Sequence, residues 1–152
     1  MPSEFDKYAA KANELLHILA EDLQVTQDKA FRILRAVLHA IRRHLEIHES
    51  LQLLAQLPMM IKAVYVDQWH IGGEFKRIHH LNQFLDEVRA CDKGLAGFDF
   101  GNDANAMKAV RAVFRSLQYY LSEGEFNDLL AVMPQDVKKF IADSIGKGRM
   151  AM

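Results

Sequence analysis

The feature that most constrains the fold is that the chain contains nearly the same pattern twice. "LLAQLPMM" begins at Leu53, and "LLAVMPQD" begins at Leu129. A shift of 76 residues aligns 30–67 with 106–143 without a gap, and 12 of the 38 aligned positions are identical. Such self-similarity is typical of a repeated structural unit. We therefore predict two copies of one unit, packed about a pseudo-twofold axis around a single core.

Each copy is predicted to be helical. Apolar residues recur at three- and four-residue steps, which is the spacing of one buried helix face. They are Phe31, Leu34, Leu38, Ile41 and Leu45 in the first copy and Val110, Phe114, Leu117 and Leu121 in the second. A further helix precedes each copy, over 4–23 and over 78–92, and no segment reads as a strand.

Capping residues predict where several of these helices begin. Ser122 and Glu125 have the spacing of a capping box, and the repeat places a second helix start near Glu46. Pro58 and Pro134 suit the first turn of another helix, where a missing N–H is tolerated.

The predicted fold is an all-α, single-domain helical bundle of about eight helices, built from two pseudo-symmetric four-helix repeats. Repeat one covers about 3–69, a linker 70–77, repeat two about 78–145, and a flexible C-terminal tail 146–152.

Composition narrows the classes of function. A chain of 152 residues with a net charge of −1 is long enough for one core and has no global field to recruit nucleic acid. The N-terminus lacks the basic and apolar regions of a signal peptide, and no apolar run is long enough to cross a membrane. The single cysteine, Cys91, excludes an internal disulfide and fits a reducing compartment. We expect a soluble, cytoplasmic protein.

Several stretches carry a resemblance to a known family. "FRILRAVLHAIRRHL", "LLAQLPMMIKAVYVDQW", "FLDEVRA", "AVRAVF" and "LSEGEFNDLLAVMPQDVKKF" span about Tyr8 to Ala142. This pattern resembles a bacterial family of uncharacterised proteins, catalogued as domain of unknown function 2267. The resemblance implies an all-α domain and supplies no catalytic residues.

No residue pattern predicts a catalytic centre, a cofactor or a metal site. His44 and His48 have i,i+4 spacing, but the helix start expected near Glu46 falls between them. "DKGLAGFDFGND" at 92–103 lacks side-chain oxygens at the third and fifth places of a calcium loop, so we expect a connection between helices, with Asn102 or Asp103 as the next cap. Cys91 lies on the apolar stripe of its helix, which favours a buried, inert thiol.

Five basic residues follow one another along the helix that begins the first copy. They are Lys29, Arg32, Arg35, Arg42 and Arg43, without an intervening acid. Such a basic face can contact phosphates, but a charge run is more often a solvated face, and the near-neutral net charge argues against nucleic acid as a partner.

The segment after Pro58 differs from its counterpart after Pro134. "MMIKAVYVDQW" is apolar on nearly every side, whereas "QDVKKFIADSI" keeps a polar face. An all-round apolar helix has to be covered, either inside the monomer, by a partner, or around a small-ligand pocket. The candidate interface is Met59, Met60, Val66 and Trp69.

These observations favour a non-enzymatic interaction or scaffold protein that binds a second copy or another protein, with no membrane association. The alternative is a helical protein that binds a small molecule or a metal between the two repeats. Nucleic-acid binding through the basic face is a weaker alternative.

Overall fold

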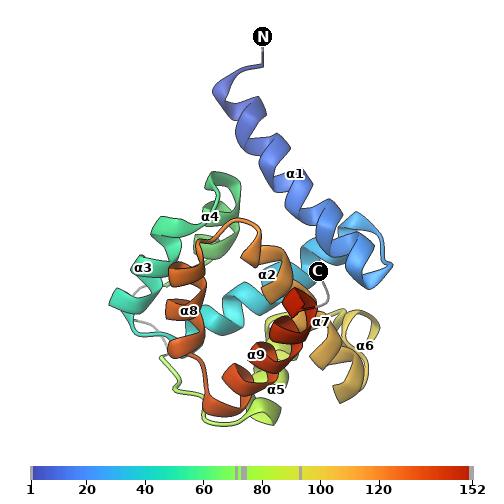
Figure 1. Ribbon diagram of the computed structural model, residues 1–152, viewed down its shortest axis with the longest axis vertical. Helices are drawn as coiled ribbons and strands as arrows, with labels where there is room; N and C mark the ends of the chain where they lie inside the picture. The colour runs from blue at the N-terminus through green and yellow to red at the C-terminus, as the bar shows by residue number, and fades with distance from the viewer. Residues whose placement is uncertain (1, 71, 73–74, 93, 151–152) are drawn as a thin grey trace.

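The computed structural model describes residues 2–70, 72, 75–92 and 94–150. In these residues the chain forms helices and no strand (Figure 1). The helices are α1 (Glu4–Leu23), α2 (Gln27–His44), α3 (Ile47–Gln56), α4 (Met59–Val66), α5 (Leu81–Cys91), α6 (Ala96–Asp99), α7 (Asp103–Gln118), α8 (Glu123–Ala131) and α9 (Gln135–Met150). The prediction of a single all-α domain is confirmed.

Most predicted helix starts are confirmed by their caps. The Ser3 hydroxyl accepts from the N–H of Asp6 at the start of α1, and the Ser122 hydroxyl accepts from the N–H of Glu125 at the start of α8. Asn102 caps α7 through the N–H of Asn105. The helix predicted over 78–92 begins at Leu81 instead, because the Gln83 side chain accepts from the N–H groups of His79 and His80 and fixes the chain there.

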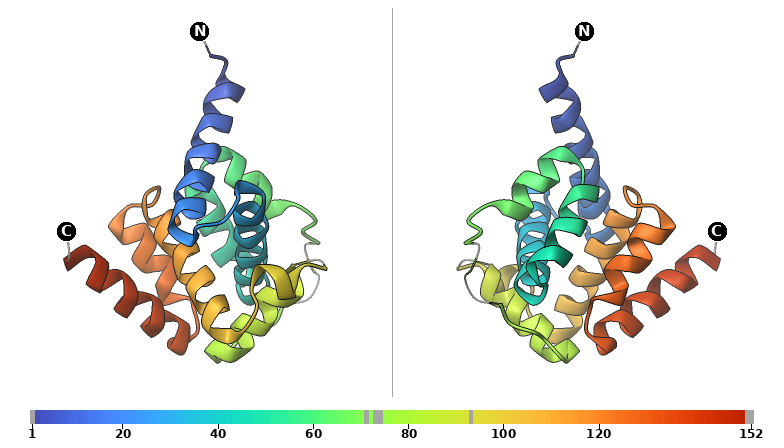
Figure 2. Two further views of the ribbon diagram at one scale, coloured as in Figure 1. Left: turned by 90° about the vertical axis from the view of Figure 1, so that its right-hand side faces the viewer. Right: turned by 90° about the vertical axis from the view of Figure 1, so that its left-hand side faces the viewer.

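α2 is the central helix, and α1, α4, α5 and α7 pack around it (Figures 1 and 2). Every residue from Phe31 to Leu45 is buried or half-buried. The five basic residues of α2 therefore do not form a fully solvated face, because neighbouring helices and the α6 segment cover each of them in part.

α1 extends beyond the body of the molecule. Its buried residues, Leu15, Leu19 and Ala20, all lie in its C-terminal half. Tyr120, just after α7, donates to Glu14, and Arg115 of α7 donates to Asp22, which ties that half of α1 to α7 and to the turn that follows it. Figure 2 shows the N-terminal half standing clear of the other helices. Phe5, in this projecting half, is 79% exposed.

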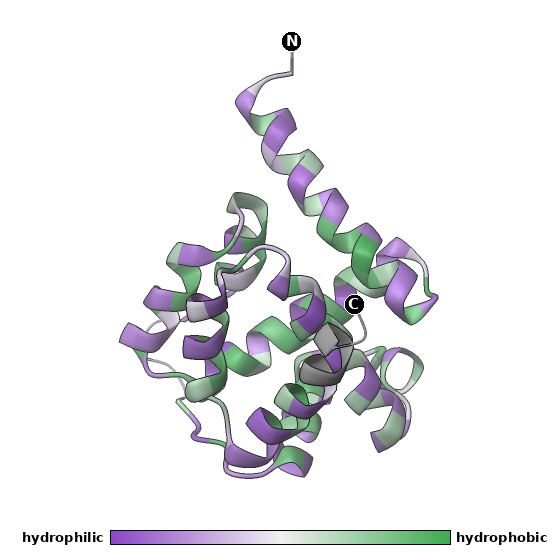
Figure 3. Cartoon of the chain, viewed as in Figure 1, coloured by the Kyte–Doolittle hydropathy of each residue, from purple (hydrophilic) through white to green (hydrophobic). Residues whose placement is uncertain are grey.

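α4 is not covered on all sides. Ile61 and Tyr65 are buried, whereas Met59, Met60 and Val66 are 47%, 41% and 39% exposed. Figure 3 shows this helix coloured largely as hydrophobic. The eight-residue helix packs against α1, α2 and α3, and these leave part of its circumference free.

The linker and tail differ in how far the structure describes them. His70, Gly72 and 75–77 lie outside helices, while 71, 73 and 74 lie outside the described residues. Residues 146–150 of the predicted tail continue α9, and 151–152 lie outside the described residues.

Candidate functional site

A cleft of about 840 Å³ lies beside the C-terminal half of α2. The segment that follows α4 and the end of α5 form its other walls. Its lining residues are His39, Arg42, Arg43, Leu45, Glu46, Ile47, Gln68, Trp69, His70, Gly72, Phe75, Ala90 and Cys91. The cleft therefore brings together two members of the predicted basic face and one member of the predicted interface.

Arg42 holds the C-terminal end of α4. Its Nη1 donates to the carbonyls of Tyr65 at 2.7 Å and Asp67 at 2.9 Å, which are among the carbonyls that a helix end leaves without partners. Its guanidinium lies 5.8 Å from the ring centroid of Trp69. Burial lowers the pKa of Arg42. Among the described residues, no carboxylate forms an ion pair with Arg42, although the charge of Asp67 is close enough to favour its protonated form.

Arg43, its neighbour, is neutralised locally. It forms an ion pair with Glu87, whose side chain is buried, and Lys76 lies 3.7 Å from the other carboxylate oxygen. A buried carboxylate needs such a partner, since desolvation of an isolated charge is costly. Arg43 and Glu87 thus form a structural pair between α2 and α5.

His39 and Cys91, which both line the cleft, are uncharged near neutral pH. His39 Nε2 lies 2.8 Å from the Val64 carbonyl, and burial lowers the pKa of the ring. Burial, together with nearby Glu87, raises the pKa of Cys91 above its usual value. A thiol in this state is a poor nucleophile, because the thiolate is the reactive form.

The other three basic residues lie away from the cleft. Arg32 forms a two-pronged pair with Asp99, Nε to Oδ2 at 2.9 Å and Nη2 to Oδ1 at 3.0 Å. Lys29 lies 4.4 Å above the ring of Phe98, and Arg35 5.3 Å from that of Phe31. The structure therefore does not gather the five predicted cations into one surface.

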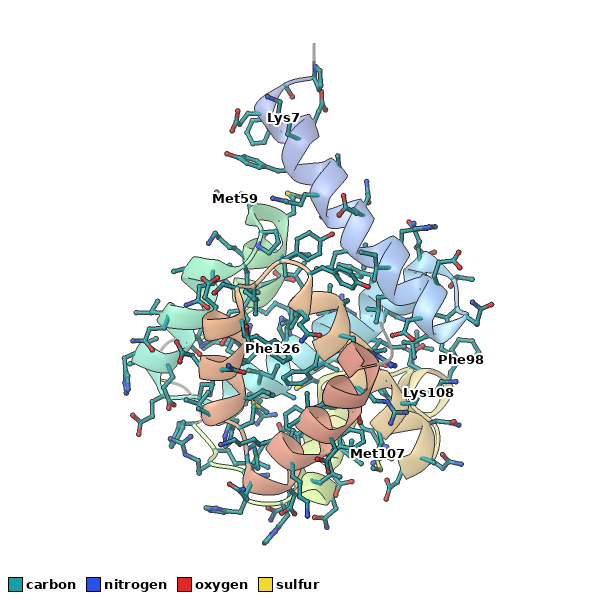
Figure 4. All side chains as sticks on the ribbon, viewed as in Figure 1. Lys7, Met59, Phe98, Met107, Lys108 and Phe126 are labelled. Carbon is teal, nitrogen blue, oxygen red and sulfur yellow. The ribbon has the colours of Figure 1, made fainter. Side chains whose placement is uncertain are left out.

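The predicted interface residues also separate. Trp69 lines the cleft and packs edge-on against Tyr65, with ring centroids 5.8 Å apart. Met59 and Met60 lie at the start of α4, the end that Figure 4 shows beside α1. Val66 lies at the opposite end of α4.

His44 is a structural histidine. It is buried, its Nδ1 accepts from the N–H of Ile78 at 2.9 Å, and its Nε2 donates to the Val132 carbonyl at 2.8 Å. Both ring nitrogens are therefore occupied, so neither is free for a metal. Within the described part of the chain, no three potential metal ligands lie together.

Sequence reasoning missed Glu87 and the buried Asp92 and Asp99. Glu87 and Asp99 meet their cationic partners through tertiary contacts, as with Arg32 and Asp99, which lie 67 residues apart. The one available signal was the position of Glu87 beside Val88 on the apolar side of α5, where an acid needs a cation.

The fold and the cleft define a single-domain helical protein with a partly polar, concave site between α2 and α5. In the described residues, no helix is both long and apolar enough to cross a membrane. The chain belongs to the family described as "Uncharacterized conserved protein (DUF2267)", whose model matches residues 12–140. A comparison with curated proteins found no match.

Proposed function

We propose that this protein is a non-enzymatic interaction protein that associates with a second copy of itself through the projecting half of α1. The observation that carries the proposal is the apolar stripe of α1, which continues beyond the body of the molecule. Leu15 and Leu19 bury the stripe in the core, and Phe5, Tyr8, Ala9 and Ala12 continue it at helical spacing.

The stripe has large and small residues in an order that favours antiparallel self-pairing. If two copies of α1 pair antiparallel about a point between Tyr8 and Ala9, residues equally distant from that point lie opposite each other. Phe5 then faces the second copy's Ala12, and Tyr8 faces its Ala9. Each ring meets a small side chain, which lets two helices approach at roughly 8–10 Å.

The exposed start of α4 extends this surface. α1 packs against α4, and Met59 and Met60 lie at the end of α4 nearest the projecting half (Figure 4). We propose that Phe5 of the second copy contacts these methionines. A flexible thioether side chain against an aromatic ring is a favourable contact.

A charge placed within the stripe tests the proposal. Phe5→Asp puts a carboxylate into the apolar contact of each copy, so the variant should sediment as a monomer where the wild-type protein sediments as a dimer.

Lys108→Asp is the matched control, because Lys108 is an exposed lysine on α7, away from the stripe (Figure 4). It should leave association unchanged. A Phe5→Asp variant that still dimerises would contradict the proposed pairing.

We also infer that the domain arose by duplication of a four-helix unit. Its support lies in equivalent positions: Thr26 and Asn102 cap α2 and α7, and α4 and α9 begin directly after Pro58 and Pro134. Each pair is separated by the 76-residue shift of the sequence repeat.

The sole thiol, Cys91, supports a reducing, cytoplasmic location.

A further inference from the structure

No carboxylate in the described part of the chain forms an ion pair with Arg42, a cation that lines the cleft beside α2. Its lining includes Arg42 and Arg43 as cations, and Arg43 is already paired with Glu87. Glu46, the carboxylate among the described lining residues, lies 3.6 Å from Arg77 and 3.5 Å from His48. Arg42 is therefore left with one positive charge facing the cleft.

The donors of Arg42 are only partly used. Nη1 is committed to the two carbonyls at the end of α4, which fixes the position of the guanidinium plane. Nε and Nη2 make no hydrogen bond to the described residues. A guanidinium presents such N–H groups in a planar fork that fits the two oxygens of a carboxylate.

The lining also has an apolar part that includes two aromatic rings, next to the polar His39, Gln68 and His70. Trp69 is fixed by its edge-on contact with Tyr65 and lies beside Arg42, and Phe75 lines the same hollow. Leu45, Ile47 and Ala90 complete the apolar part. A few placed polar groups in a mostly apolar cleft are typical of small-molecule sites, and 840 Å³ is within their usual range.

We propose that this cleft binds a small aromatic monocarboxylate. The carboxylate accepts from Nε and Nη2 of Arg42, and the ring lies against Trp69. A ligand with a single negative charge is favoured. Of the two arginines that line the cleft, Arg42 alone has no ion pair among the described residues, whereas a phosphate monoester carries up to two negative charges. This inference goes beyond the proposed interaction role and uses none of the α1 residues on which that role depends.

Titration calorimetry with 2-naphthoate and its neutral analogue 2-naphthamide tests the proposal. The two probes share the ring system and differ in the charge that Arg42 recognises. We expect 2-naphthoate to bind at least about tenfold more tightly than 2-naphthamide. A hydrogen bond to a charged group usually changes the affinity by about this factor. 2-Naphthyl phosphate should bind more weakly than 2-naphthoate.

Variants of Arg42 assign the preference to one residue. Arg42→Gln should remove the preference for 2-naphthoate and leave 2-naphthamide unaffected, whereas Arg42→Lys should retain part of it. Arg111→Gln is the matched control, since Arg111 lies 5.5 Å from the ring of Phe140, outside the cleft. Should Arg42→Gln fail to fold, the two probes on the wild-type protein still decide the question.

Two intrinsic reporters place the ligand. Trp69 is the single tryptophan and Cys91 the single cysteine of the chain, and both line the cleft. Bound 2-naphthoate should change Trp69 fluorescence and slow modification of Cys91 by a thiol reagent. Equal binding of the two naphthyl probes, no binding of either, or binding that leaves both reporters unchanged would overturn the proposal.

Discussion

At the residue scale, the most unusual group is Asp92, the C-cap of α5. Asp92 and Asp99 are both buried, and Arg32 pairs with Asp99. Burial, and then the neighbouring Asp99, raise the pKa of Asp92 to about 7, whereas Arg32 is the main influence that keeps the pKa of Asp99 below its usual value. Near neutral pH the protonated Asp92 is the favoured partner of an ionised Asp99.

The raised pKa of Asp92 predicts a pH-dependent stability. The unfolded carboxyl has a pKa of 3.8 and the folded one of about 7, so the folded state holds the extra proton between these values. The stabilisation is complete below the lower pKa and is lost as the pH rises through about 7. Asp92→Asn should therefore be more stable than the wild type at about pH 8, by a few kcal/mol at most, with a smaller difference at about pH 5.

Urea unfolding at both pH values measures this difference. Asp86→Asn, at an exposed position of the same helix, is the control and should change little. An Asp92→Asn variant that is no more stable at the higher pH would contradict the assignment.

His44 gives a second prediction at this scale. Its ring joins the N–H of Ile78 to the carbonyl of Val132, and burial lowers the pKa of the ring. His44→Phe keeps the volume but leaves two buried backbone groups without partners, so it should destabilise the fold by about 2–5 kcal/mol. His48→Phe, at an exposed position, should cost little, and equal losses in thermal unfolding would refute the structural role.

The lowered pKa of His44 also determines how its contribution to stability changes with pH. The neutral ring contributes stability that is present above the unfolded pKa of about 6.5 and is lost as the pH falls below it. Asp92 acts in the opposite direction over the same range, so the two single variants separate the two effects.

At the element scale, local signals fixed most helix starts, and tertiary contacts fixed the rest. Ser3, Asn102 and Ser122 are foreseeable because a cap bonds to backbone three residues away. α6 and the late start of α5 were not foreseen. α6 is four residues long and rests on the Asp99–Arg32 pair, and such a turn has no periodicity to detect.

The cap of α8 can be tested directly. The Ser122 hydroxyl accepts from the N–H of Glu125, whose carboxylate accepts from the N–H of Ser122 at 2.8 Å. Ser122→Ala removes one bond of this capping box and should lower the free energy of unfolding by about 1 kcal/mol. Asn127→Ala, exposed in the same helix, should change it by less, and identical effects in urea unfolding would argue against the cap.

At the scale of the whole molecule, the sequence predicts an all-helical domain, but it does not predict which helix surfaces remain exposed to solvent. The apolar character of α4 was correctly recognised, yet its exposure depends on how many neighbours an eight-residue helix receives. Likewise, Arg42 and Trp69 were singled out for different reasons, and only the fold places them in one cleft. Such juxtapositions depend on packing, which sequence periodicity does not specify.

The proposed association rests on the projecting half of α1. Phe5 is 79% exposed there and Tyr8 and Ala9 are half-buried, and a helix end with so few packing contacts is only marginally stable in water, so its apolar stripe needs a cover. Phe5→Ala should weaken the association by roughly tenfold or more, because it removes a large apolar contact from both ends of the pair. Leu95→Ala, a similar loss at another exposed position, is the control.

Sedimentation equilibrium of the wild-type protein over a wide concentration range is the most direct measurement. We expect the measured mass to rise with concentration to twice 17.4 kDa. The Phe5→Ala variant should reach this mass only at a higher concentration. A mass of 17.4 kDa at every concentration would contradict association through α1.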